Sequence, residues 1–342
     1  MVKKRHRITI KDVAKEAGVS PSTVSRVISN NPRISRKTTE KVLTHMTRLG
    51  YQPNAIARNL AKNSSRTIGL IMPDRPGEAL LNPFFPEALR GIIKAATQAS
   101  YDILLSSTPP GTDDYNTVRE LVSTAKVDGV LLMTSKVENK SIQYLREMEF
   151  PFSVIGSPYE ESDDSNHVDN DNEMASYELT TYLVKKGCKR LALITGGRFL
   201  TVTEERIKGF KRALKESGLR EEEGVIFVGE FSEETGKKYA REIIQAGREF
   251  DAVVATDDVV AYGVVSAFVE GGLKVPEDIM VAGFNNSLLS RQCTIPITSV
   301  EIHADQLGAH AVDVILENIH KGEPQKKRKV PHTIYKRKST FD

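Results

Sequence analysis

Short apolar segments that alternate with amphipathic stretches constrain the fold of this 342-residue chain more than any other feature. The segments are TIGLIM (67–72), DILLSS (102–107), DGVLLM (128–133), PFSVI (151–155), RLALIT (190–195), VIFV (225–228), DAVVA (251–255) and DIMVAGF (278–284). Continuous apolar runs are typical of strands buried on both faces, and their alternation with helices is typical of parallel sheets. Because about ten strand–helix units exceed the usual size of one sheet, we predict two doubly wound parallel-sheet lobes.

The predicted lobes also indicate where a ligand would bind. In open α/β sheets, ligands bind beyond the carboxyl ends of the strands. Two such lobes that face each other form a cleft between them. We therefore expect a small-molecule site in this cleft, where a ligand could drive the two lobes to close.

The first 66 residues differ from the rest of the chain in their charge. They hold 15 Lys and Arg against 3 Asp and Glu, whereas the other 276 residues hold 33 against 42. A small basic segment on an acidic body is typical of a nucleic-acid-binding head. The alternative is a basic tail that is merely solvated.

The N-terminal segment also carries the pattern of three helices. Helix starts are indicated by Thr9, by Ser20 followed by Pro21, and by Ser35. Inward-facing apolar positions are Ile10, Val13, Ala14, Ala17, Val24, Val27, Ile28, Val42, Met46 and Leu49. Two short helices around the turn at Gly18 form a helix-turn-helix. We therefore predict an all-α DNA-binding headpiece over residues 1–53, with an ordinary three-helix bundle as the alternative.

The outward face of the second predicted helix suits a DNA major groove. Ser22, Ser25 and Arg26 face outward on it. Small side chains permit a close approach, and an arginine can bond guanine O6 and N7 together, which is worth about 1–3 kcal/mol of base discrimination.

Several classes of protein are excluded by what the sequence lacks. Its two cysteines, Cys188 and Cys293, form no CxxC pair, which argues against a metal site or a disulfide framework and fits a reducing compartment. The basic start is followed by no apolar region of a signal peptide, and no apolar run approaches the roughly 20 residues of a membrane span. No phosphate-binding loop or catalytic motif is present. We expect a cytoplasmic protein without membrane contact that is not an enzyme and has no cofactor.

Two contiguous segments, IKDVAKEAGVSPSTVSRVISN and YQPNAIARNLA, resemble the headpiece and hinge of the LacI family of repressors. The resemblance implies that Pro21, Ser22 and Arg26 read bases. It implies that Ser20, Thr23 and Ser25 mainly contact phosphates, and that Thr9 also binds DNA. Pro21 departs from the residues common at its position. Because it lacks an N–H and a side-chain donor, we expect only an apolar contact there.

The resemblance makes residues 54–63 a hinge. It implies that the hinge is disordered alone, becomes helical on operator DNA, and pairs with a second hinge in the minor groove. Eight residues, NAIARNLA, are too few for a stable isolated helix. Asn54 is placed to cap this helix, Ala57 lies within it, and Leu60 would act as a wedge between base steps. The alternative for Leu60 is a core leucine.

Residues 64–342 resemble the periplasmic-binding-protein-like body of the same family, which binds an effector and dimerises. In that body the chain crosses between the lobes three times, and we place the crossings near 160–164, 289–294 and 325–330. Lobe 1 would then hold 67–160 and 293–325, and lobe 2 would hold 165–290 and 330–342.

The resemblance also implies a set of effector contacts. They are Phe84, Phe85, Arg206, Phe231, Asp257 and Asn285. The phenylalanines would stack on a sugar ring, and the arginine would grip hydroxyls with its fixed donors. Asn285 stands where the family usually has Asp, so a charge-assisted acceptor is lost there. The alternatives are a surface ion pair for Arg206, a helix cap for Asp257, core packing for the phenylalanines and a turn for Asn285.

Together these observations predict a sugar-responsive repressor that binds a pseudo-palindromic operator as a homodimer and is released by its effector. The segment 69–92 resembles the branch of the family that regulates maltose operons, which implies maltose or a related α-glucoside. Two alternatives remain. One is a ligand-independent or phosphocarrier-protein-assisted catabolite regulator of the same family, and the other is a free sugar-binding protein.

Overall fold

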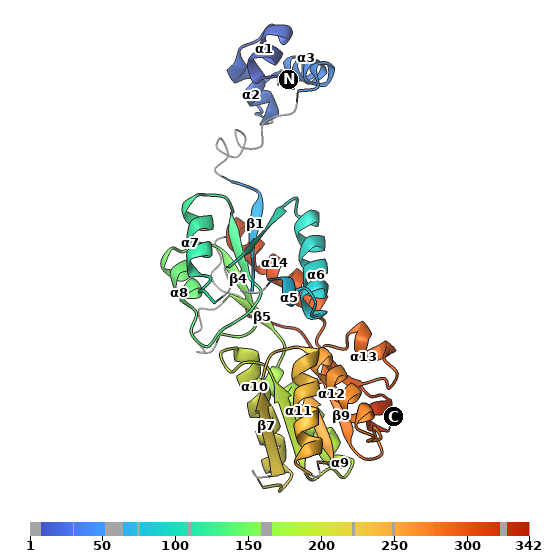
Figure 1. Cartoon of the computed structure of the whole chain (residues 1–342). Coiled ribbons are helices and arrows are strands. Elements are labelled where there is room, and N and C mark those ends of the chain that lie inside the picture. Colours follow the sequence, from blue (N-terminus) through green and yellow to red (C-terminus); the bar gives the residue numbers. More distant parts are fainter. Residues whose placement is uncertain are drawn as a thin grey trace. The chain divides into compact units, whose positions relative to one another are not determined.

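The computed structural model describes residues 8–29, 31–51, 64–73, 76–108, 111–158, 166–220, 223–247, 250–321 and 327–341 (Figure 1). The chain divides into two compact units, with the boundary between Arg66 and Thr67. The hinge positions Asn54, Ala57 and Leu60 lie outside the described residues.

The first unit contains three helices whose ends follow from their capping residues. They are α1 (Ile10–Ala17), α2 (Pro21–Ile28) and α3 (Arg36–Leu49). At the start of α1, the Asp12 carboxylate accepts hydrogen bonds from the Thr9 backbone N–H (2.8 Å) and hydroxyl (2.7 Å). Ser20 Oγ accepts from the Thr23 N–H at the start of α2 (3.1 Å). Such caps satisfy N–H groups that have no partner within the helix.

One side of each helix forms the core of this unit. The fully buried side chains are Val13, Ala14, Ala17, Val24, Val27, Val42 and Met46. They stand at the helical spacing of one face, so the opposite faces remain exposed. These contacts hold α2 against α1 and α3 with its polar face outward.

The second unit contains two lobes, each built on a six-stranded sheet (Figure 1). The first sheet has the order β11-β5-β4-β3-β1-β2, and its paired strands all run parallel. Its strands are β1 (Thr67–Met72), β2 (Asp102–Ser107), β3 (Gly129–Leu132), β4 (Phe152–Ile155), β5 (His167–Asp169) and β11 (Lys327–Lys329). Its helices are α5 (Pro76–Ala79), α6 (Phe84–Gln98), α7 (Tyr115–Ser123), α8 (Lys140–Glu147) and α14 (Ala304–Lys321).

Helices cover both faces of this sheet, because alternate residues of each strand point to opposite sides. Ile68 and Leu70 of β1 pack in the cluster that contains α6 and α14, whereas Ile71 packs in the cluster that contains α7 and α8. Figure 1 shows α7 and α8 on the other side of the sheet from α6 and α14.

The second sheet has the order β12-β10-β9-β8-β6-β7, and β12 alone among its strands runs antiparallel to its neighbour. Its strands are β6 (Leu191–Thr195), β7 (Gly224–Val228), β8 (Ala252–Ala255), β9 (Met280–Phe284), β10 (Thr298–Glu301) and β12 (Thr333–Tyr335). Its helices are α9 (Asn172–Lys185), α10 (Thr201–Glu216), α11 (Glu233–Gln245), α12 (Asp258–Glu270) and α13 (Leu288–Gln292), with the short 3-10 helix η2 (Lys338–Thr340). Leu191 and Leu193 pack toward α9 and α10, and Ala192 and Ile194 pack toward α11 and α12.

The crossings between the lobes lie later in the chain than the sequence analysis places them. Because β5 still pairs with β4 in the first sheet, the first crossing follows Asp169 and does not lie at 160–164. Because β10 pairs with β9 in the second sheet, the second crossing follows Glu301 and does not lie at 289–294. The third follows β11, which pairs with β5, and precedes β12, so it lies at 330–332 and not at 325–330. Residues 167–169 therefore belong to the first lobe and 298–301 to the second, which corrects both predicted lobe boundaries.

The fold class predicted from the sequence is confirmed: an all-α helix-turn-helix headpiece precedes an α/β body of two doubly wound lobes. Among the helices that the structure describes, none is long and apolar enough to cross a membrane.

Candidate functional site

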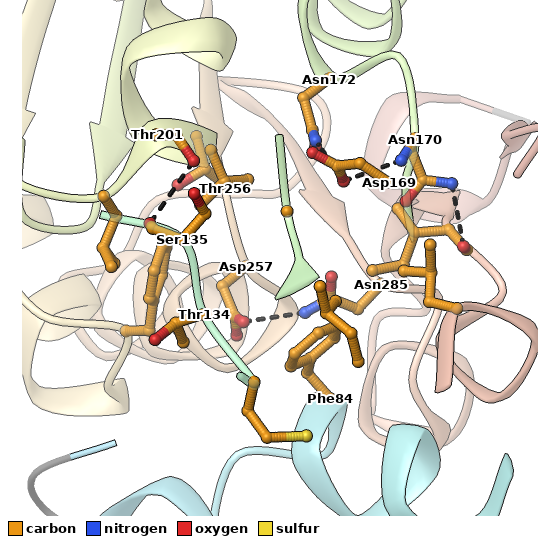
Figure 2. A pocket seen from close by; sticks show the side chains of 18 of the residues that line it. Phe84, Thr134, Ser135, Asp169, Asn170, Asn172, Thr201, Thr256, Asp257 and Asn285 are labelled. Carbon is orange, nitrogen blue, oxygen red and sulfur yellow. Dashed lines mark hydrogen bonds between the residues drawn. The ribbon is translucent and has the colours of Figure 1, made fainter. Parts of the chain in front are cut away.

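Residues of both lobes line a cavity at the carboxyl ends of the strands (Figure 2). It contains about 700 Å³ of empty space, part of which is open to solvent. All six predicted effector contacts line it: Phe84, Phe85, Arg206, Phe231, Asp257 and Asn285. The phenylalanines at 84 and 85 come from the first lobe and the other four from the second, so the fold brings together positions up to about 200 residues apart in the chain.

Asp257 is at the centre of a hydrogen-bond network in this cavity. One carboxylate oxygen, Oδ1, accepts from the Val259 N–H (2.7 Å) and so caps α12. The other, Oδ2, accepts from two side-chain amides, Asn82 Nδ2 and Asn285 Nδ2, each at 2.8 Å. Burial raises the pKa of this carboxyl group, and the bonds from Asn82 and Val259 and the charge of Arg206 oppose that rise. Asp257 is therefore both a helix cap and a cavity residue.

Arg206 on α10 is buried beneath the cavity rather than paired on the surface. Its side chain is held by hydrogen bonds from Nε to Asn172 Oδ1 (3.0 Å) and from a terminal nitrogen to the Thr256 carbonyl (2.6 Å). The guanidinium also lies over the Phe284 ring, 4.2 Å from its centroid. Burial lowers the pKa of Arg206 to about 10, against the attraction of Asp169 and Asp257, so the group stays charged at neutral pH. Its orientation is fixed in advance of any ligand.

Three polar residues of the first crossing also line the cavity, and the sequence analysis did not assign them to it. They are Asp169, Asn170 and Asn172. Asp169 is buried and accepts from the Asn172 amide (2.9 Å) and from the Ser157 N–H (2.8 Å). The Asn170 amide donates to the carbonyls of Ile302 (3.0 Å) and Val330 (2.9 Å), which lie on the other two crossings. The Asn170 side chain thus joins all three crossings between the lobes. The only feature of the sequence that could indicate this role is its position directly after a short strand.

The aromatic residues line the cavity from both sides. Phe84 and Phe85 stand edge to face, with ring centroids 5.1 Å apart. Phe231 follows β7 and lies against Gly196, which follows the neighbouring strand β6. A cavity lined by aromatic rings from both lobes and by a few fixed polar groups can hold a ligand that has both apolar faces and hydrogen-bonding groups.

A short backbone bridge joins the two lobes at the edge of the cavity. The Val137 N–H donates to the Phe199 carbonyl (2.9 Å), and the Thr201 N–H donates to the Ser135 carbonyl (3.2 Å). Lys136 and Leu200 form an isolated antiparallel bridge between these bonds. Figure 2 shows Ser135 and Thr201 joined on one side of the cavity and Asp257 joined to Asn285 near Phe84.

In the first unit, α2 presents the predicted DNA-reading positions on its exposed side. Pro21, Ser22, Ser25 and Arg26 are exposed, and Thr23 is half-buried. Ser20 precedes the helix as its cap, and its hydroxyl bonds those of Ser22 (2.8 Å) and Thr23 (2.9 Å). Thr9 is exposed as the cap of α1. An exposed helix face without an acidic side chain suits a DNA groove.

Comparison with known proteins identifies the family of both units. Residues 9–54 match the model of bacterial regulatory proteins of the lacI family, and residues 180–340 match that of a periplasmic binding protein-like domain. The chain is 36% identical to the HTH-type transcriptional regulator MalR of Streptococcus pneumoniae over 93% of its own length and 95% of that protein.

Two solved structures of regulators extend the comparison. A probable maltose operon transcriptional repressor, malR, from Staphylococcus aureus is 28% identical, with a TM-score of 0.74 over 82% of this chain and 99% of that one. The transcriptional regulator CelR in complex with cellobiose is 26% identical, with a TM-score of 0.76 over 97% of this chain and all of that one. The chain is therefore a member of the LacI family, a DNA-binding transcriptional regulator and not an enzyme.

Proposed function

We propose that this protein is a sugar-responsive repressor of a carbohydrate-utilisation operon, and that maltose or a related α-glucoside releases it from operator DNA. The observation that carries the proposal is the cavity between the lobes, which is lined by three phenylalanines together with Arg206 and Asp257. Aromatic faces stack on the apolar face of a pyranose ring, while fixed polar groups bind its hydroxyls.

The ionisable groups of the cavity favour an uncharged ligand. Among the described residues that line it, these groups are Asp169, Arg206 and Asp257. Arg206 is the one cation among these lining residues, and it already bonds Asn172 and Thr256. A phosphorylated sugar would find no further cation among these residues, whereas sugar hydroxyls can both donate to carboxyl oxygens and accept from amides.

The choice of an α-glucoside rests on relatives. The solved structures that resemble this chain include a probable maltose operon repressor, and maltose is an α-glucoside. The regulator CelR is bound to cellobiose, a β-glucoside, and therefore supports a disaccharide but not the linkage. Residues 69–92 support the maltose branch at the level of sequence. A disaccharide also explains why aromatic rings are available from both lobes.

We infer a homodimer on a pseudo-palindromic operator. One α2 helix reads only a short half-site, so two-fold symmetry in the protein doubles the contacts with DNA. The first lobe exposes large apolar side chains that a second copy would cover, including Leu81 (82% exposed), Leu105 (50%) and Ile93 (49%).

Release requires that the sugar bind the DNA-incompetent state more tightly, and a coupling of about 1–3 kcal/mol is usual between two such sites. When sugar closes the cleft in each protomer, the first lobes of the dimer would shift against each other. This shift would separate the two hinges and lower the affinity for operator DNA. A ligand with equal affinity for both states would have no effect on DNA binding.

The test combines a thermal-shift screen of sugars with operator titrations. Maltose should raise the melting temperature by mass action and weaken operator binding of the full chain. Arg206→Ala should abolish the thermal shift with maltose but keep operator binding. Arg26→Ala should keep the thermal shift but weaken operator binding.

Tighter operator binding in the presence of maltose would overturn the inducer mechanism. No shift with any neutral sugar would overturn the sugar site and favour a phosphorylated metabolite or a phosphocarrier protein as the signal.

A further inference from the structure

Gly196 and Phe231 meet where two neighbouring strands end. Gly196 is the first residue after β6 and Phe231 the third after β7, and these strands are paired so that Thr195 is opposite Val228. A Cβ atom built on Gly196 would lie 2.5 Å from Cζ of the Phe231 ring and 2.6 and 2.9 Å from its two Cε atoms. Real Cβ atoms do not approach other atoms this closely, so any larger residue at 196 must displace the ring.

The backbone gives no other reason for glycine at this position. Gly196 is buried and is not among the glycines with positive φ, so its main-chain conformation is open to alanine. The missing side chain is therefore needed for space, and the group that fills the space is the ring of Phe231. Phe231 lines the cavity and Gly196 does not, so the ring lies between the glycine and the empty volume.

The next residue offers a matched contrast. A Cβ on Gly197 would lie 2.3 Å from Cε1 of Phe199. Phe199 is 63% exposed and does not line the cavity, so its ring can move into solvent at little cost. Two consecutive glycines thus each support an aromatic ring, and only the first of these rings faces the candidate ligand.

From this geometry we infer that Gly196 is a positioning residue for Phe231, and that it sets the width of the sugar cavity at the wall formed by the second lobe. The inference rests on the proposed function and concerns which saccharides fit. A methyl group at 196 takes the space that the ring now fills and pushes the ring away from Gly196, toward the cavity that the ring lines. The space left for a pyranose ring stacked on Phe231 then decreases.

The experiment compares Gly196→Ala with Gly197→Ala in the full chain. Maltose affinity is measured by calorimetry, since overpacking one wall of a binding site removes close ring–sugar contacts. We expect Gly196→Ala to bind maltose at least about tenfold more weakly than the wild type and Gly197→Ala to bind it equally well. Unchanged affinity in Gly196→Ala, or equal losses in both variants, would overturn the inference.

A readout without ligand separates this inference from the proposed function. Gly196→Ala should lower the melting temperature more in the wild-type background than in the Phe231→Leu background. In the second background the leucine side chain is smaller than the ring, so the clash with the added methyl group is removed. Equal losses in both backgrounds would show that the ring does not fill the space and would overturn the inference. If the wild type bound no sugar, the proposed function would fail, while this cycle would still decide whether Gly196 positions Phe231.

Discussion

Asp258, the neighbour of Asp257, is a buried carboxyl group whose bonds stay within the second lobe. It is 1% exposed and accepts from Ser299 Oγ (2.6 Å) and from the Ser287 N–H (2.7 Å). These bonds tie α12 to β10 and to the start of α13. Burial raises its pKa to about 7, even though these hydrogen bonds favour the ionised form.

The raised pKa of Asp258 predicts a pH dependence of stability. Between the ordinary pKa of 3.8 and about 7, the folded chain binds a proton at Asp258 that the unfolded chain has lost. The resulting stabilisation is fully present below the unfolded pKa and is lost as pH rises through the folded pKa. Urea midpoints of the wild type should therefore exceed those of Asp258→Asn by more at pH 5.5 than at pH 8. A difference that is the same at both pH values would contradict the raised pKa.

For single residues, the sequence predicts several side chains that line the cavity, but it does not predict contacts between residues that only folding brings together. Arg206, Asp257 and Asn285 could be proposed because each matches a position of a known family. Asn82 could not, because its amide bonds a carboxylate that is 175 residues away. No local pattern marks such a residue, since its role depends on which loop of the other lobe lies opposite.

The strands that the sequence analysis missed are those whose stability does not come from apolar side chains. β10 consists of Thr298, Ser299, Val300 and Glu301, and its buried hydroxyls bond other side chains, Asp258 from Ser299 and Thr340 from Thr298. β5 and β11 are three residues long, and β11 reads KRK. Their place in the sheet is fixed by backbone pairing with neighbours, so apolar periodicity could not find them, and the predicted crossings shifted accordingly.

The bridge between α10 and the first lobe can be weakened by one substitution that the helix tolerates. Thr201 is the first residue of α10, where proline is well accepted, and Leu200 before it has the extended conformation that proline requires (φ −94°, ψ 132°). Thr201→Pro deletes both groups that donate to the Ser135 carbonyl, the N–H (3.2 Å) and the side-chain hydroxyl (3.4 Å), and leaves the bond between Val137 and Phe199 in place. We expect it to weaken sugar binding about three- to tenfold, because both bonds to the Ser135 carbonyl are lost, while Thr201→Ser, which keeps both donors, has no effect. Equal affinities in calorimetry would show that this bridge does not support the ligand-bound state.

For the whole second unit, the contacts across the cleft form without a ligand. Residues 135–137 of the first lobe pair with 199–201 of the second, and Asn82 bonds Asp257. The equilibrium between open and closed lobes is thus set partly by the chain itself. The apparent affinity for a sugar is reduced by the fraction of molecules that are not closed, so these contacts contribute to the affinity even where they do not touch the sugar.

Asn82 and Asn285 allow the contribution of the chain to closure to be measured. Both amides donate to the same oxygen of Asp257 at 2.8 Å, but Asn82 comes from the first lobe and Asn285 from the same lobe as Asp257. Replacing either by alanine removes one bond from the carboxylate, and only Asn82→Ala removes a link across the cleft.

Spin labels at Arg119 on α7 and Lys215 on α10, both exposed, would report the distance between the lobes. In the sugar-free protein, Asn82→Ala should lengthen or broaden this distance and Asn285→Ala should leave it unchanged. Saturating maltose should then restore the short distance in Asn82→Ala, because ligand binding energy replaces the lost bond. A longer distance in both variants would mean that the charge balance at Asp257, and not the bond from the first lobe, controls closure.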